Sequence, residues 1–224
     1  MMDLSKKRTS VESLILLLLT LIICKIIYEC RFLPWVHQYL STLTALLLIY
    51  IPFSYMWWRR LALDFIERDF KSMIRSLEIG IIFSVIIFPI FLLANNLYQE
   101  LFLASLYRGW YYPEIVQFSV YQIFLIAIPE EFFFRGYIQS QLNRIFPPNF
   151  SLFGLRWGWS IPLTALIFAF SHTFITFQWW HFSIFFPGLV FGVLREKTGG
   201  LIAPIFFHTL SNVIVQGIGY MYRS

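Results

Sequence analysis

The chain has 224 residues, of which 58% are hydrophobic, 21% aromatic and only 13% charged. Soluble domains carry about 25% charged residues, and apolar runs long enough to cross a bilayer recur here, so the composition excludes a soluble domain and predicts a polytopic membrane protein. The net charge of +5 requires no nucleic-acid partner, because membrane proteins carry Lys and Arg in their loops to set their orientation.

The first half of the sequence predicts three membrane spans and one interfacial helix. The spans are expected at residues 11–28, 39–58 and 79–97, and Pro89 should kink the third. Between the second and third spans, residues 59–77 place apolar side chains on one helical face and basic side chains on much of the rest. This pattern predicts a cytoplasmic amphipathic helix that lies in the membrane interface.

The second half predicts four further spans. One starts near residue 115, and the others cover residues 159–177, 182–194 and 201–222. The sixth is short and contains Pro187-Gly188. The chain is therefore predicted to be a single all-α membrane domain, residues 1–224, with about seven transmembrane helices.

The distribution of Lys and Arg predicts how the chain is oriented in the membrane. With the N-terminus in the cytoplasm, all but four of the 17 basic residues fall on the cytoplasmic side; the exceptions are Lys25, Arg31, Arg108 and Arg223. Cytoplasmic loops of membrane proteins carry an excess of Lys and Arg. A multi-pass protein of the cell (inner) membrane with a cytoplasmic N-terminus is therefore predicted.

Two carboxylates and an arginine interrupt the apolar run of the fourth span. Ionisable groups at membrane depth cost about 2.5–3.5 kcal/mol each on insertion scales, so those that are present usually have a function. Glu131 and Arg135 have the i, i+4 spacing of a helical ion pair, with the acid on the favourable N-terminal side. Glu130 points roughly 100° away from Glu131 around the helix. It is therefore free of this pair and is the candidate catalytic base.

The later spans contain two histidines and an asparagine. His172 lies in the fifth span, and His208 and Asn212 share one face of the seventh at i, i+4. All three side chains are expected to line one cavity with Glu130, in the cytoplasmic half of the membrane. A carboxylate and an imidazole beside a water form a general-base arrangement, and a second imidazole and an amide are donors suited to an oxyanion. Hydrolysis of an amide needs these groups and no cofactor.

These residues form three short motifs in a fixed order: Glu130-Glu131-x-x-x-Arg135, Phe168-x-x-x-His172 and His208-x-x-x-Asn212. The set resembles the CAAX-protease and bacteriocin-processing (CPBP, or Abi) group of intramembrane endopeptidases, whose eukaryotic member is the Ras-converting CAAX endopeptidase. The resemblance covers about residues 117–217, within a predicted catalytic core of residues 113–222; residues 1–112 match only as generic spans. The length of the chain is nearer to that of the bacterial members.

The resemblance implies a glutamate-dependent protease and a role for each motif. Glu130 would activate water with the help of His172, while His208 and Asn212 would form the oxyanion hole. The remaining motif residues would have structural roles: Glu131 and Arg135 would hold the catalytic side chains in place, and Phe168 would pack behind them. The substrate would be a membrane-associated protein or peptide, such as a CAAX-like tail, a leader peptide or a C-terminal sorting anchor.

Other interpretations of the same residues stay open. Two His and two Glu suffice to bind zinc, although the sequence has no His-Glu-x-x-His helix and Arg135 disfavours a dication at Glu131. His172 is also compatible with a structural role as a core histidine bonded to a backbone carbonyl, and His208 with Asn212 is compatible with a helix-packing pair. A membrane peptide-binding or immunity protein without enzymatic activity, or a transporter, is the alternative from another functional class.

Overall fold

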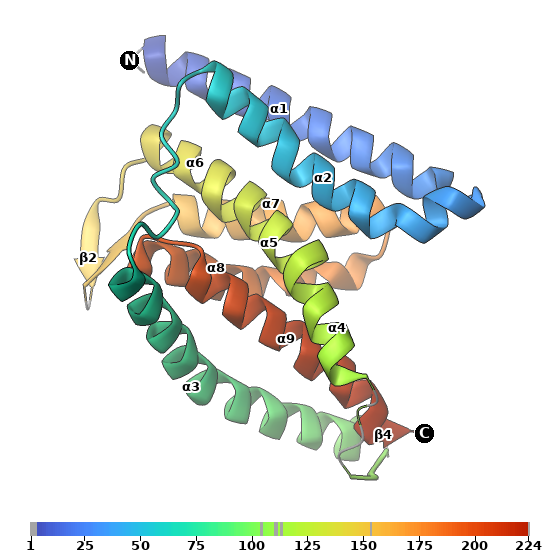
Figure 1. Cartoon of the computed structure of the whole chain (residues 1–224). Helices are drawn as coiled ribbons and strands as arrows, with labels where there is room; N and C mark the ends of the chain where they lie inside the picture. Colours follow the sequence, from blue (N-terminus) through green and yellow to red (C-terminus); the bar gives the residue numbers. More distant parts are fainter. Residues whose placement is uncertain (1–3, 104, 110–111, 113, 153, 224) are drawn as a thin grey trace.

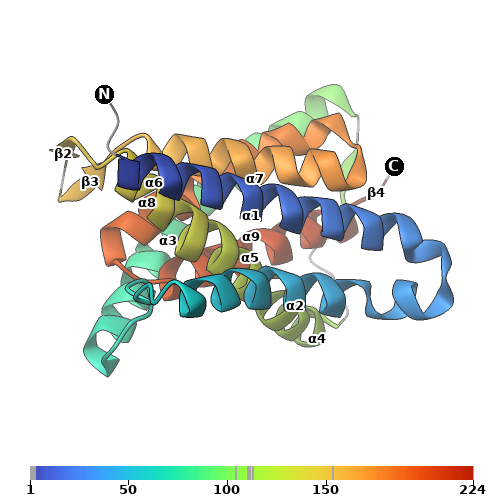
Figure 2. The same ribbon diagram turned by 90° about the horizontal axis from the view of Figure 1, so that it is seen from above.

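The computed structural model describes residues 4–103, 105–109, 112, 114–152 and 154–223. The N-terminal half consists of long helices, namely α1 (Leu4–Glu29), the short 3₁₀ turn η1 (Cys30–Phe32), α2 (Pro34–Trp58) and α3 (Phe70–Phe102). α1 and α2 pack side by side as an antiparallel hairpin (Figures 1 and 2). α3 contains Pro89 and curves along the opposite side of the molecule (Figure 1), as expected for a helix that lacks one internal hydrogen bond.

A helix of 31 residues, Ile115–Ile145, forms the middle of the chain, and its winding changes along its length. It consists of α4 (Ile115–Tyr121), the π-helix η2 (Gln122–Ala127), the single turn α5 (Ile128–Glu131), a second π-helix η3 (Phe132–Gln139) and α6 (Ser140–Ile145). π-Helical turns are rare and occur frequently at functional sites. The turn that contains both glutamates is therefore flanked on both sides by π-helical segments.

The C-terminal part adds α7 (Ser160–Thr176), the 3₁₀ turn η4 (Trp179–Ile184), α8 (Phe185–Thr198) and α9 (Ile202–Met221). Two short antiparallel strand pairs complete the fold: β1 (Leu106–Tyr107) with β4 (Tyr222–Arg223), and β2 (Phe150–Leu152) with β3 (Leu155–Trp157). α7 and α8 pack against each other, and α9 contacts α3, α8 and the central helix. α9 thus lies at the centre of the bundle (Figure 1).

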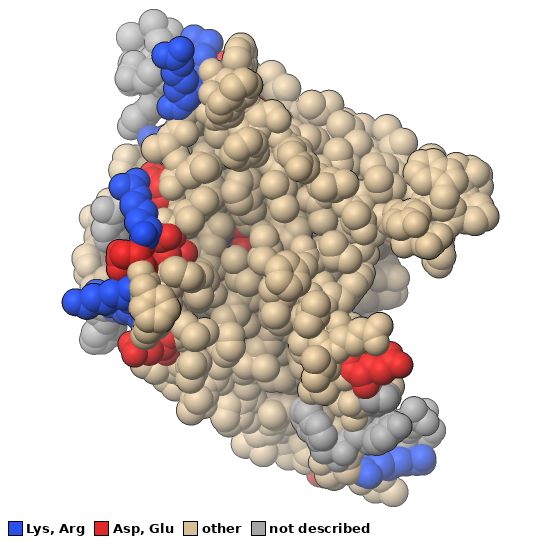
Figure 3. Space-filling view, in the orientation of Figure 1, with Lys and Arg blue, Asp and Glu red and all other residues tan. Residues whose placement is uncertain are grey.

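The distribution of side chains is that of a protein embedded in lipid. The core between α5, α7, α8 and α9 is aromatic, with Phe133, Phe168 and Phe207 almost fully buried. Many large apolar side chains of α1 and α3 point outward instead; Val85, for example, is 67% exposed. In Figure 3 the charged residues of the visible face gather at the left edge and the lower right, and the band between them is uncharged except for a small spot near its centre. An apolar belt between two polar ends is the arrangement that a bilayer requires.

The predicted all-α polytopic membrane fold is confirmed, with a difference in the lengths of two spans. Among the described residues, five helices are long and apolar enough to cross a membrane, and they correspond to the first four predicted spans and the seventh. The fifth predicted span is the apolar helix α7, of 17 residues. The sixth is α8, of only 14 residues, preceded by η4. At 1.5 Å per residue, α8 measures about 21 Å and is shorter than a hydrocarbon core of about 30 Å.

The prediction of an amphipathic helix over residues 59–77 is wrong for residues 59–69. α2 ends at Trp58, Arg60 has a left-handed φ of 52°, and residues 61–69 form turns and irregular structure. Asp69 then caps α3, because its carboxylate accepts the backbone N–H of Ser72 at 2.9 Å. Residues 70–77 are helical, but they form the first two turns of α3 rather than a separate interfacial helix.

Glu67 explains why this connection does not stay helical. Its carboxylate accepts the backbone N–H groups of Leu201 at 3.2 Å and Ile202 at 3.0 Å, and the hydroxyl of Ser76 at 2.8 Å. The first N–H groups of a helix have no partner within the helix, and a carboxylate there is also favoured by the helix dipole. The connection thus caps α9, the helix that contains His208 and Asn212.

Loss of this cap should destabilise the protein. Glu67→Ala is expected to lower the free energy of unfolding by about 1–2 kcal/mol, the usual cost of removing a helix N-cap, as measured by denaturant titration in detergent micelles. Glu78→Ala, which removes an exposed carboxylate of α3, is the matched control and should change it by less than about 0.5 kcal/mol. Equal effects of the two substitutions would contradict the capping role.

Candidate active site

The candidate site is built around the α5 turn. Pro129 has no N–H to donate to the preceding turn, and α5 is bounded by the π-helices η2 and η3. Within this turn the side chain of Glu131 is fully buried, whereas that of Glu130 is 15% exposed. Two adjacent carboxylates thus lie in different environments, as the sequence predicted from their angular separation.

Glu131 and Arg135 form the predicted ion pair. Arg135 Nη1 donates to Glu131 Oε1 at 2.9 Å, and both side chains are fully buried. Arg135 Nη2 donates to the carbonyl oxygen of Gly188 in α8 at 3.1 Å. The guanidinium also lies 4.3 Å and 4.8 Å from the ring centroids of Phe168 and Phe191, within cation–π distance. The pair therefore ties the central helix to α7 and α8.

Glu131 also fixes the orientation of His208, which the sequence did not predict. His208 Nδ1 lies 2.8 Å from Glu131 Oε1, and the imidazole stacks on Phe191 with ring centroids 4.6 Å apart. A carboxylate paired with arginine only accepts hydrogen bonds, so Nδ1 of His208 is the donor. The other ring nitrogen, Nε2, is thereby directed at the second glutamate.

Glu130 lies between two histidines. Its Oε2 atom is 3.7 Å from His172 Nε2 and 3.8 Å from His208 Nε2. These distances are too long for direct hydrogen bonds, and the Oε2 atom, although buried, has no hydrogen-bond partner among the described residues. Residues 130, 172 and 208 come from three different helices, so the tertiary fold brings them to one point.

His172 is oriented by its own helix. Its Nδ1 atom donates to the carbonyl oxygen of Phe168 at 2.9 Å, one turn earlier in α7. The ring of Phe168 contacts the imidazoles of His172 and His208 edge-on, with centroids 4.6 Å and 6.0 Å apart. Phe168 therefore packs behind the site, and its carbonyl leaves His172 Nε2 facing Glu130.

Asn212 has a partner that the sequence analysis missed. Its Nδ2 atom donates to Oε1 of Gln122 at 2.7 Å, and Gln122 is buried in η2. Asn212 lies one turn after His208 on α9, as predicted, and its amide keeps a second N–H for another acceptor. A glutamine in an apolar span eight residues before Glu130 was the available signal, because a buried polar side chain needs a partner.

The described residues were compared with the side-chain clusters that bind metal ions in proteins. No group of three or more His, Cys, Asp or Glu side chains there is placed to hold a metal ion. Oε1 of Glu131, moreover, is shared by Arg135 and His208. One carboxylate faces two imidazoles between the helices of a polytopic membrane protein, and such an arrangement is able to carry out acid–base chemistry.

Comparison with known protein families agrees with this class of site. A model of the family described as type II CAAX prenyl endopeptidase Rce1-like matches residues 112–214, which include all three motifs. No curated protein and no solved structure matches the chain. The match to this family of CAAX-type peptidases covers just under half of the chain, and for residues 112–214 it confirms the resemblance predicted from the motifs.

Proposed function

We propose that the protein is an intramembrane glutamic endopeptidase that hydrolyses a peptide bond of a membrane-associated protein or peptide. The observation that carries the proposal is the position of Glu130 Oε2, 3.7 Å and 3.8 Å from the Nε2 atoms of His172 and His208. A spacing of this size suits a bridging water that donates one hydrogen bond to the carboxylate and one to an imidazole.

The hydrogen bonds of the histidines support the role of Glu130 as base. His172 Nδ1 donates to Phe168, so Nε2 of the neutral ring is an acceptor. A water that donates to Glu130 and His172 directs both of its hydrogens at bases and turns a lone pair toward the substrate. Its oxygen attacks the scissile carbonyl carbon while Glu130 takes the proton. When the carbon–nitrogen bond breaks, Glu130 returns this proton to the leaving amine.

The other side of the site suits the oxyanion that forms in this step. The carboxylate of Glu131 accepts from His208 Nδ1 and so holds the ring with Nε2 toward the site; a protonated imidazole donates from both ring nitrogens. Asn212 is held by Gln122 through one N–H and keeps the other. The two donors project from one face of α9, and removal of a single oxyanion donor typically costs about 10²–10³-fold in rate.

An apolar groove near the site supports a membrane-associated substrate. A groove of about 240 Å³ between α3, α8 and α9 is lined almost entirely by apolar side chains, with Phe207 next to His208 in sequence. An apolar tail or membrane segment of the substrate fits such a surface better than a soluble peptide does. A CAAX-like tail, a leader peptide and a sorting anchor all meet this requirement. We place the N-terminus in the cytoplasm of a cell (inner) membrane protein, on the strength of the Lys and Arg distribution.

A comparison of protein termini tests the function. Membrane and secreted proteins from cells with wild type or Glu130→Gln, at matched expression, would be analysed for new and missing terminal peptides. Termini that disappear in the mutant and cluster beside one sequence motif would support the protease and identify its substrate. Unchanged termini, together with a cellular phenotype that persists in Glu130→Gln, would refute it and favour a peptide-binding protein or transporter.

The proposed mechanism uses no metal or other cofactor and predicts the effect of chelators. Cleavage by the purified enzyme in detergent should be unchanged, within about twofold, after dialysis against EDTA and phenanthroline, because every step is assigned to side chains. The measurement is the rate of cleavage of a substrate peptide before and after dialysis. Loss of activity that added zinc restores would contradict the prediction and favour a zinc site formed by the two histidines and Glu130.

A further inference from the structure

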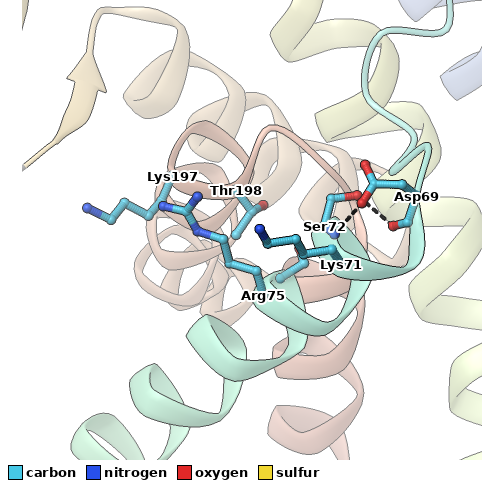
Figure 4. Close-up of a pocket in the computed structure, with 7 residues that line it drawn as sticks. Asp69, Lys71, Ser72, Arg75, Lys197 and Thr198 are labelled. Carbon is cyan, nitrogen blue, oxygen red and sulfur yellow. Dashed lines mark hydrogen bonds between the residues drawn. The ribbon is translucent and has the colours of Figure 1, made fainter.

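A second candidate site lies at the N-terminal end of α3, where basic side chains gather in a pocket. The pocket has a volume of about 300 Å³ and lies between the first turns of α3 and the end of α8. Its lining residues are Asp69, Lys71, Ser72, Arg75, Ser76, Lys197 and Thr198. In Figure 4 the side chains of Lys71 and Arg75 extend from α3 toward the end of α8, where Thr198 lies.

The charges of this basic pocket favour an anion. Three of the lining side chains are cationic and one, Asp69, is anionic. The Asp69 carboxylate already caps α3 by accepting the N–H of Ser72, and the nearby Glu67 carboxylate accepts the hydroxyl of Ser76 and two N–H groups of α9. Among the described residues, Lys71 and Arg75 have no carboxylate within ion-pair distance. The pocket therefore holds an excess of positive charge.

The position of the two cations on α3 has an energetic cost within the protein. Lys71 and Arg75 are at i, i+4 on one helical face, where like charges repel each other. Lys71 also lies in the first turn of α3, where the helix dipole disfavours a cation. No described residue offsets the repulsion between Lys71 and Arg75 or the unfavourable dipole at Lys71. A bound anion would offset both.

The surroundings of the pocket identify the anion as part of a lipid. The exposed neighbours of the two cations on the same helix turns are apolar, namely Phe70, Met73, Ile74 and Leu77. At the same edge of the molecule, Trp57 and Trp58 at the end of α2 are 78% and 71% exposed. Exposed tryptophans next to basic residues mark the membrane–water interface. An amphipathic surface of this kind places acyl chains beside the apolar residues and a headgroup beside the cations.

We propose that the basic pocket binds the phosphate group of an anionic membrane lipid. Lys71 and Arg75 pair with the phosphate, and the acyl chains lie along the exposed apolar side of α3. The bound lipid thereby connects α3 to the turn between α8 and α9, which precedes the helix of His208 and Asn212.

Binding of defined lipids to the full chain in detergent, followed by native mass spectrometry, tests this site. The probes are phosphatidylglycerol, phosphatidylcholine with the same acyl chains, and inorganic phosphate. Wild type should prefer phosphatidylglycerol to phosphatidylcholine by at least tenfold. Lys71→Gln with Arg75→Gln should weaken phosphatidylglycerol binding roughly thirtyfold, because each basic residue near anionic lipid contributes about 1 kcal/mol.

Two control variants separate the pocket from the general charge of this face. Arg60→Gln with Arg68→Gln removes the same charge from exposed positions outside the pocket and should retain binding within threefold. Lys71→Arg with Arg75→Lys keeps the charge and should retain binding, which shows that the positions tolerate substitution. Wild-type affinity in the Lys71/Arg75 glutamine variant, or an equal loss in the Arg60/Arg68 variant, would overturn the proposal. Binding of inorganic phosphate as tight as that of phosphatidylglycerol would overturn the assignment to a lipid.

Discussion

Glu130→Gln is expected to lower the rate of substrate cleavage by about 10²–10⁴-fold, the contribution typical of a positioned general base. Glutamine has nearly the shape of glutamate but does not accept a proton at neutral pH. The Oε2 atom of Glu130 makes no direct hydrogen bond to a described residue, so the substitution leaves no buried partner behind. The free energy of unfolding should therefore stay within about 1 kcal/mol of wild type. The measurements are single-turnover cleavage of a substrate peptide and denaturant unfolding in the same detergent.

Glu78→Gln is the matched control for this prediction. It removes a carboxylate of the same size from an exposed position on α3 and should change neither rate nor stability. Cleavage by Glu130→Gln at a rate within a factor of three of wild type would refute the role of Glu130 as base. A drop in stability comparable to the drop in activity would show instead that this carboxylate supports the fold.

The parts of the site that depend on local helical geometry were predictable from sequence. The i, i+4 spacing of Glu131 and Arg135 predicted their ion pair, and the angle between the two glutamates predicted that Glu130 lies apart from it. The depths of His172 and His208 along their spans predicted that both approach Glu130. Each of these inferences uses only the rise and the period of a helix.

The contacts between distant segments were not predictable in this way. The hydrogen bond from His208 to Glu131 spans 77 positions of the chain, and that from Asn212 to Gln122 spans 90. The period of residues 59–77 suggested one amphipathic helix, yet Glu67 bonds to the start of α9 and Asp69 caps α3. Tertiary hydrogen bonds override helix propensity in such connections, since a buried helix end needs partners for its N–H groups.

Glu131→Gln should impair stability and activity together, in contrast to Glu130→Gln. The substitution leaves the fully buried guanidinium of Arg135 without its counter-charge, and breaking a buried ion pair from one side costs about 3–5 kcal/mol. It also deprives His208 Nδ1 of a charged acceptor. Thermal unfolding in detergent and the cleavage rate of the protein that remains folded measure the two effects separately.

A double variant distinguishes the two roles of Glu131. Replacing a buried ion pair with neutral side chains of similar volume is often close to neutral for stability, so Glu131→Gln with Arg135→Met should recover most of the stability lost in Glu131→Gln alone. Its activity should stay low, because His208 Nδ1 still lacks the carboxylate that orients the imidazole. Recovery of both stability and activity in the double variant would show that Glu131 only neutralises Arg135. A Glu131→Gln protein as stable as wild type would show that the buried pair contributes little to the fold, and the orientation of His208 would then be the only function left for this carboxylate.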